Sequence, residues 1–295
     1  MKNIRLLLFC FFNLLIQSSY SQINFIDLSQ KQLRLLHELK NTPDSIRSKV
    51  FLDSLYRPHK QFWSGYAGEE KDFTDWMNKE GYHFLDFFDK RNREIDGQLL
   101  LKKFNEVQAS MQKLTGYTAS GTWYFVFSHA ATDLGGLSSG EMVLDLSHQS
   151  NSSTEKIELI MPHEINHLIC SKLSRFDEGD ALSFALSEGF AVFINEVYWG
   201  KKYTSAQHLG YTEAEYQLCE KNKEFIRQFF DEFKFSKDPK IINYFRNAGL
   251  SIRYDLPPKI GYYIGYNLIK NFAKNHDWRE IYKLKSSEIL AQSKF

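Results

Sequence analysis

The 295-residue sequence has little cysteine, little proline and almost no net charge. It contains three cysteines and six prolines, and its 37 basic and 36 acidic residues leave a formal net charge of +1. Nucleic acids and anionic membrane surfaces recruit clustered positive charge, so this balance gives no reason to expect either as a partner. The sequence also lacks a Pro/Gly/Ser-rich linker and a run of like charges, which predicts one compact unit without an internal boundary.

No apolar run is long enough to span a bilayer comfortably. The longest one near the N-terminus, residues 4–16, follows basic residues and is itself followed by Ser19 and Ser21, where a signal peptidase reads small side chains. This pattern predicts a signal peptide over residues 1–21, with cleavage before Gln22. The mature protein is then exported to the periplasm or the extracellular space and has no integral membrane span. An uncleaved N-terminal anchor is the alternative.

The three cysteines allow at most one disulfide in the mature chain. Cys10 lies inside the apolar run without small residues leading into it, which argues against a lipid-bearing cysteine. Cleavage leaves Cys170 and Cys219, which can either pair or remain buried free thiols. Cleavage also removes two basic residues, so the mature net charge is about −1.

Apolar periodicity predicts an α+β protein that is mainly helical. Residues 26–116 carry apolar side chains at helical spacing, and we interpret their many aromatic rings as core. Residues 121–127 and 141–146 have the composition and partial alternation of strands, joined by a glycine-rich loop. Domain organisation is therefore predicted as a helical N-terminal part, residues 22–120, and a catalytic part, residues 121–295.

The second half of the chain is predicted to be helical after the second strand. Ser152 and Glu155 resemble a capping box, and Pro162 either kinks one long helix or lies in the first turn of a new one. The expected helices cover residues 163–170, 181–198, 213–233, 241–248, 260–274 and 278–290.

The motif that carries chemistry is His163-Glu164-Ile165-Asn166-His167. Residues four apart lie on one face of a helix, so the two histidines can present ring nitrogens to one zinc ion. Glu164 lies close to the metal without being forced into its coordination shell, where it can accept a proton from metal-bound water. A lone histidine is usually a satisfied polar group, whereas this spacing predicts a metal site.

A catalytic zinc ion needs a third protein ligand and an open position for water. Glu188 is the candidate, because a loop after the first helix lets a second helix return antiparallel, and small Gly189 and Ala191 let the two helices approach closely. Other acidic or histidine side chains could serve instead, but each of them is more typical of a surface or capping residue. These competitors are Asp177, Asp180, Glu196 and His148.

The HExxH helix, the segment Ser187-Glu188-Gly189-Phe190-Ala191 and the late segment Gly261-Tyr262-Tyr263-Ile264-Gly265-Tyr266 together resemble a family of predicted zinc-dependent proteases of the gluzincin type. The resemblance covers roughly residues 120–275 and implies a zincin-like metalloprotease fold. It also implies that two histidines and a downstream glutamate bind zinc. A fainter similarity leads to an envelope lipoprotein family linked to gliding motility, from which this chain departs by lacking a lipid-bearing cysteine.

The expected function is therefore that of an exported zinc peptidase acting on peptides or proteins. Zinc-bound water, deprotonated by Glu164, attacks a carbonyl group. Tyr262 or Tyr266 could stabilise the oxyanion, although close helix packing explains the Gly-Tyr pairs equally well. Residues 141–146 could align an extended peptide as an edge strand. The alternative is a non-catalytic cell-envelope or surface-assembly protein that retains a structural zinc site.

Overall fold

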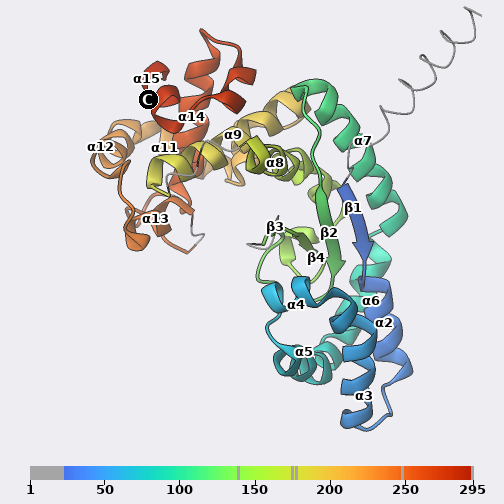
Figure 1. Ribbon diagram of the computed structural model, residues 1–295. Helices are drawn as coiled ribbons and strands as arrows, with labels where there is room; N and C mark the ends of the chain where they lie inside the picture. Colours follow the sequence, from blue (N-terminus) through green and yellow to red (C-terminus); the bar gives the residue numbers. More distant parts are fainter. Residues whose placement is uncertain (1–22, 138–139, 174–175, 177–178, 247–248, 294–295) are drawn as a thin grey trace, which may run out of the picture.

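The computed structural model describes residues 23–137, 140–173, 176, 179–246 and 249–293 (Figure 1). The predicted signal peptide, its cleavage site and Cys10 lie outside the described residues. None of the described helices combines the length and the apolar character that a bilayer span requires.

A four-stranded sheet lies at the centre of the molecule (Figure 1). Its strands are β1 Ile23–Asp27, β2 Gly121–Val126, β3 Leu134–Gly136 and β4 Met142–Asp145. They lie in the order β1-β2-β4-β3, with β1, β2 and β4 parallel and β3 antiparallel to β4. The two predicted strands are thus confirmed as β2 and β4, whereas β1 and β3 are missed because each is short and lies beside helical or glycine-rich sequence.

The position of β4 overturns one prediction. Residues 141–146 were expected to offer a free strand edge to a peptide, but β4 is paired with β2 on one side and with β3 on the other. Its backbone groups are therefore used within the sheet, and that prediction is wrong. The strand at the sheet edge on this side is β3.

The N-terminal part is helical, as predicted, apart from β1. Its α-helices are α2 Ser29–Glu38, α3 Asp44–Phe51, α4 Lys60–Tyr66, α5 Glu70–Trp76, α6 Leu85–Glu94 and α7 Gly97–Thr115. Single turns of other helix types lie at Leu52–Tyr56 and Met77–Gly81 (π) and at Arg57–His59 (3₁₀). Because β1 pairs with β2, this part shares a sheet with the second half of the chain.

Alternating side chains of β2 join the sheet to helices on its two faces. Trp123 meets the Phe104 ring of α7 edge to face, with ring centroids 4.4 Å apart. The next residue, Tyr124, stacks on Phe62 of α4 at 4.0 Å. Successive strand residues point to opposite faces, so one strand anchors both helices. These rings are buried, which confirms that the aromatic residues of this region form core.

The second half contains α8 Thr154–Leu173, α9 Ala181–Trp199, α10 Ser205–Leu209, α11 Glu213–Lys221, α12 Lys223–Phe233, α13 Pro239–Arg246, α14 Ile260–Ala273 and α15 Ser286–Gln292. Three 3₁₀ turns complete the described part, at Gln149–Asn151, Gly200–Lys202 and Trp278–Lys283. The helices α9 and α14, predicted over residues 181–198 and 260–274, are confirmed almost to the residue.

The structure corrects two of the helices predicted for this half and settles the open question about Pro162. The helix predicted over residues 213–233 is interrupted at Asn222, whose side chain donates to the Leu218 carbonyl oxygen at 2.8 Å. Residues 278–290 form a 3₁₀ turn followed by α15. Pro162 lies inside one continuous helix, α8.

The predicted capping box at the start of α8 is wrong by one residue. The Lys156 N–H donates to the hydroxyl of Ser153, at 3.3 Å, and Ser152 accepts instead from the Lys156 ammonium group. The question left open for the cysteines is also resolved, because Cys170 and Cys219 are both buried and free.

Candidate metal centre

The helix α8 supplies the two histidines of the site. Its buried residues include Ile157, Met161, Ile165 and Ile169, whose spacing of four fixes one face of the helix in the core. His163 and His167 lie on a neighbouring face, also four residues apart. Their Nε2 atoms lie 3.1 Å from each other, so the predicted convergence of the two rings is present.

The helix α9 brings Glu188 to the histidines. Asp180 begins this helix by accepting a hydrogen bond from the Ser183 N–H at 2.8 Å. At its other end, the indole N–H of Trp199 donates to the Leu159 carbonyl oxygen near the start of α8, at 3.0 Å. The two helices therefore run antiparallel, as the sequence analysis expects, and the middle of α9 faces the middle of α8.

Three ligand atoms converge on one point. Glu188 Oε2 lies 3.3 Å from His163 Nε2 and 3.4 Å from His167 Nε2. Ligands bound tetrahedrally to zinc at 2.0–2.2 Å lie about 3.3 Å from one another, which matches these separations. Among the described residues, these three form the one group of His, Cys, Asp or Glu side chains close enough to hold a metal ion.

The surroundings of the Glu188 carboxylate also support a metal ion at this point. Its Oε2 atom is buried and has no hydrogen bond of acceptable geometry to a described residue, although both imidazole nitrogens lie within ion-pair distance. A buried carboxylate oxygen without a hydrogen bond is costly. A cation at the shared point would satisfy it, so the donor set suits a single zinc ion.

The competing ligands have other partners. Asp180 caps α9, Glu196 Oε2 accepts from the Tyr266 hydroxyl at 2.6 Å, and His148 Nδ1 accepts from the Ser150 N–H at 3.3 Å. Asp177 lies outside the described residues. The expectation that the described competitors have capping or surface roles agrees with these contacts.

The charges of the three groups depend on one another. Burial alone would raise the pKa of Glu188, but His167 and then His163 outweigh it and hold that pKa well below its usual range. Burial likewise opposes protonation of His167, yet the Glu188 carboxylate raises the pKa of this ring to about 9. Burial lowers the pKa of His163. These directions favour a charge on His167, paired with Glu188, over a charge on His163.

Glu164 lies beside the triad but outside it. Its nearest carboxylate oxygen is 3.9 Å from His163 Nε2. Burial raises the pKa of Glu164 to about 8; the neighbouring carboxylates Glu188 and Asp133 add to the rise, and the cationic ring of His167 opposes it. The side chain is therefore mostly protonated near neutral pH and can donate a hydrogen bond.

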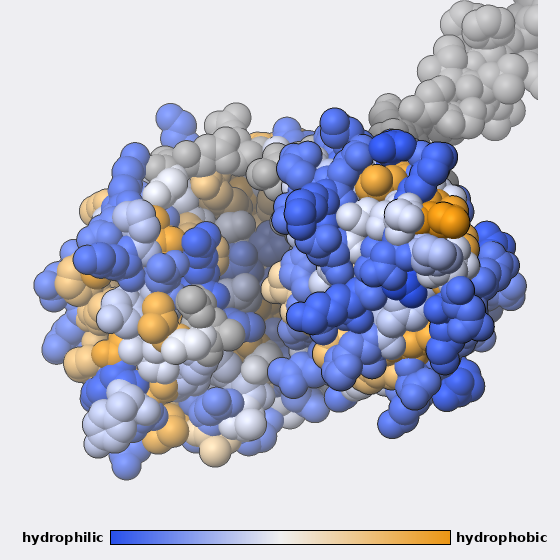
Figure 2. All heavy atoms as spheres, turned by 90° about the horizontal axis from the view of Figure 1, so that it is seen from below, coloured by the Kyte–Doolittle hydropathy of each residue, from blue (hydrophilic) through white to orange (hydrophobic). Residues whose placement is uncertain are grey.

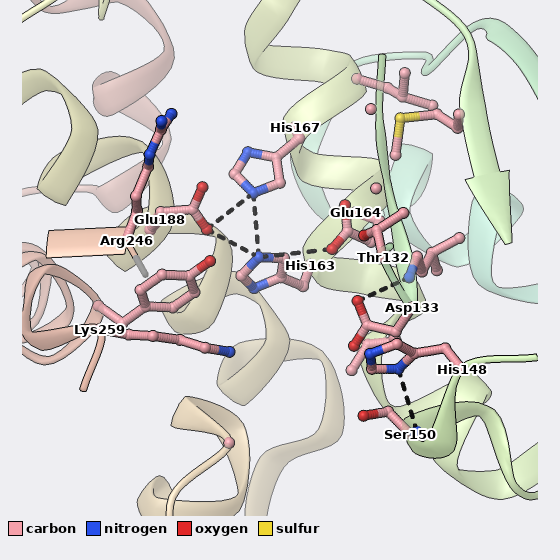
Figure 3. A pocket seen from close by; sticks show the side chains of 18 of the residues that line it. Thr132, Asp133, His148, Ser150, His163, Glu164, His167, Glu188, Arg246 and Lys259 are labelled. Carbon is pink, nitrogen blue, oxygen red and sulfur yellow. Dashed lines mark hydrogen bonds and ion pairs between the residues drawn. The ribbon is translucent and has the colours of Figure 1, made fainter. Parts of the chain in front are cut away.

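A cavity of about 810 Å³ opens onto the triad. The face seen from below in Figure 1 is hollowed between two halves of the molecule (Figure 2). Figure 3 shows Arg246 and Lys259 on the Glu188 side of the cavity, and Asp133 and His148 on the Glu164 side. The cavity thus has a basic wall at the end of α13 and the start of α14, and an acidic wall formed by Glu164 of α8 and by Asp133 just before β3.

Asp133 and the two residues of the basic wall, Lys259 and Arg246, were not predicted as site residues. Asp133 precedes β3, a strand too short to be recognised, while Lys259 is a single basic residue just before α14 and Arg246 is one at the end of α13. Neither has a neighbour in the sequence that marks it as part of a site. Only the folded chain brings them to the cavity.

The two tyrosines proposed as oxyanion stabilisers have different surroundings. The Tyr262 ring lies parallel to the His163 ring, with centroids 6.2 Å apart, and lines the cavity. Tyr266 is fully buried and its hydroxyl contacts Glu196 and Ser205. A role in the cavity is thereby excluded for Tyr266, whose adjacent glycine serves helix packing.

The chain is similar to one known family over part of its length. A family model described as gliding motility protein GldB matches residues 151–295, just under half of the chain. The similarity is to a motility protein. The matched residues include the triad, Tyr262, Lys259 and Arg246, but not the sheet. No curated protein and no solved structure matches the chain significantly.

The match overturns the peptidase interpretation. The matched family is named for gliding motility and is not a peptidase family, so the predicted resemblance to gluzincin proteases is wrong. The assignment as a metallopeptidase or other hydrolase falls with it, as does the peptide-hydrolysing mechanism in which Glu164 is the general base. The fainter similarity to an envelope family linked to gliding motility is the one that the match supports.

Proposed function

We propose that this protein is a non-catalytic component of the cell envelope that acts in surface assembly, in the manner suggested by its similarity to the gliding motility protein GldB. The observation that carries the proposal is the family match over residues 151–295, which contains the whole triad. Export to the periplasm or the cell surface is part of the proposal. The exported location can be checked by N-terminal sequencing of the mature protein, which is expected to begin at Gln22.

We further propose that His163, His167 and Glu188 bind one zinc ion with a structural role. These residues come from α8 and α9, so a bound ion would cross-link two helices at the middle of the matched segment. An ion that binds only the folded chain stabilises it by about 4 kcal/mol at a thousandfold excess over its dissociation constant. The zincin-like character of this helix pair stays a prediction.

Three protein ligands leave a fourth coordination position open. In a protein without catalytic function, that position is available to a group from a binding partner. Such an arrangement suits an assembly role, because the metal site is complete only when the partner is bound.

The test compares the wild type with His163→Ala and Glu164→Gln. Wild type and Glu164→Gln are expected to contain one zinc ion per chain and to lose thermal stability on chelation, whereas His163→Ala is expected to contain none. Glu164→Gln is the matched control, since it changes the motif without removing a ligand. Metal content by mass spectrometry and thermal unfolding measure both effects.

A cellular arm separates the assembly role from catalysis. In a gliding host that depends on this protein, His163→Ala is expected to abolish motility and Glu164→Gln to preserve it. Loss of motility in Glu164→Gln with its zinc retained would contradict the non-catalytic role. A wild-type protein that takes up no zinc would contradict the metal site itself.

A further inference from the structure

Lys259 is a half-buried cation beside the triad. It lines the cavity beside the triad, and among the described residues no carboxylate lies within ion-pair distance of its ammonium group. Its backbone has φ 57°, in the left-handed region that a residue with a Cβ rarely adopts. Strained backbone that places a charged side chain in a cavity is a feature of ligand-binding sites.

The position of Lys259 relative to the triad follows from two ring contacts. Its Nζ atom lies 5.4 Å from the centre of the Tyr262 ring, and that ring is parallel to the His163 ring with centroids 6.2 Å apart. Figure 3 shows the Lys259 side chain extending along the cavity toward His163. Lys259 thus lies beside the Tyr262 ring, which in turn lies against the His163 ring of the triad.

Arg246 adds a second cation to the same wall. It is exposed, lines the cavity at the end of α13, and forms no ion pair with a described residue. Two other arginines of this half, Arg253 and Arg227, do form ion pairs, with Asp255 at 2.5 Å and with Glu224 at 2.6 Å. Leaving two cations unpaired beside a metal site favours an anionic ligand.

The opposite wall limits the charge of that ligand. Asp133 lines the cavity opposite Lys259, so a dianion would meet repulsion there, while a singly charged group could lie against Lys259. We propose that the cavity binds the carboxylate of a partner polypeptide between Lys259 and the open position of the metal site. This inference rests on the proposed zinc site and names the chemistry of the partner that the site recognises.

The cavity volume suits part of a polypeptide. Sites of roughly 300–1,000 Å³ enclose ligands of small-molecule size, and about 810 Å³ has room for a few residues. The carboxylate could come from a chain terminus or from an acidic side chain. Both present the same group to Lys259, so the experiment must distinguish them.

The test uses full-length mature protein loaded with Co²⁺, whose visible spectrum reports changes in coordination. Four probes are titrated: acetyl-Ala-Ala-Ala with a free C-terminus, its C-terminal amide, acetyl-Ala-Glu-Ala-amide, and inorganic phosphate. We expect the free-acid peptide or the glutamate peptide to shift the spectrum and the fully blocked amide to have no effect. Whichever carboxylate peptide binds more tightly identifies the source.

Two variants test the role of Lys259. Lys259→Met keeps the Cβ and the aliphatic length but removes the charge, and we expect carboxylate binding to weaken about 10-fold or more. Lys274→Met removes an equal charge near the far end of the same helix, outside the cavity, and is expected to bind like the wild type. Each variant's far-ultraviolet spectrum confirms that it is folded.

The outcomes separate the two proposals. A protein that shows no cobalt spectrum contradicts the metal site of the proposed function. A normal cobalt spectrum that no carboxylate peptide changes overturns the present inference alone, as does equal binding by the wild type and Lys259→Met. Tighter binding of phosphate than of either carboxylate peptide also overturns it.

Discussion

Gly189 of α9 and Gly265 of α14 bring the two helices into backbone contact. A Cβ atom added to Gly265 would lie 1.7 Å from the carbonyl oxygen of Ala185, and one added to Gly189 would lie 2.0 Å from the carbonyl carbon of Gly265. The sequence predicts that Gly189 lets α8 and α9 approach, but its close contact is with α14. This contact holds Glu188, the residue before Gly189, next to the helix that carries Tyr262.

Gly265→Ala is therefore expected to destabilise the protein strongly. Neither obstructing atom belongs to a flexible side chain, so the helices must separate, at a cost of about 3 kcal/mol or more. Urea unfolding of the metal-free protein measures the loss. Gly97→Ala is the control, because its added Cβ would meet only Asp27 Oδ2 at 3.6 Å, and it is expected to be neutral or slightly stabilising. Equal stability of the two variants would contradict the tight contact.

Sequence reasoning identified the triad because its evidence is local or repeats at fixed spacing. His163 and His167 follow from helical periodicity, and Glu188 follows from a second helix long enough to return antiparallel. Lys259 and Asp133 could not be identified in this way, since each reaches the cavity through contacts between elements distant in the chain. The function assigned to the motif was wrong because a metal-binding spacing indicates ligands and says little of what the bound ion does.

The strands show the same limit. β2 and β4 have several apolar residues in succession, whereas β3 has three residues, two of them glycine. β3 is a strand because it pairs with β4. The three residues of β3 do not by themselves indicate this pairing. Misplacing the sheet edge on β4 was a direct result.

Among the described acidic residues outside the triad, we expect substitution of Asp145 to cause the largest loss of stability. It is fully buried at the end of β4, where its carboxylate accepts from the Tyr66 hydroxyl at 2.7 Å and from backbone N–H groups of Ser128, Ala130 and Ser147. Asp145→Asn places an amide donor against these donors and should cost about 3 kcal/mol in the free energy of unfolding.

The control for Asp145→Asn is Asp96→Asn. Asp96 also accepts two backbone hydrogen bonds, from Gln98 and Leu99, but as the N-cap of α7 at an exposed site. Asparagine is an equally good N-cap, so this change should alter stability by less than about 0.5 kcal/mol. If both variants unfold at the same urea concentration, the buried carboxylate has no special role.

Stability is expected to fall as the pH rises above about 9. Burial raises the pKa of both Cys170 and Cys219 to about 12. A raised folded-state pKa means that stability is fully present below the unfolded-state value and is lost as the pH rises toward the folded-state value. Between pH 8 and pH 10, each thiol should therefore contribute a loss of about 1–2 kcal/mol.

Urea unfolding at the two pH values, with a reducing agent present, measures this loss. Cys219→Ala removes one titrating thiol, so its stability should depend less steeply on pH than that of the wild type, whatever its stability at pH 8. An unchanged pH dependence in this variant would show that the thiol does not contribute.

Lys259→Gly tests whether the strained backbone is kept for binding. Glycine adopts φ 57° without a Cβ clash, which relieves about 1 kcal/mol of strain, although the more flexible unfolded chain offsets part of this gain. The variant should therefore be as stable as the wild type or slightly more stable, while its cobalt form loses carboxylate binding as Lys259→Met does. Because Lys259→Met retains the strain, the pair separates the charge from the backbone. Marked destabilisation of Lys259→Gly would mean that the side chain supports the fold, and the case for a binding residue at this position would then rest on its charge alone.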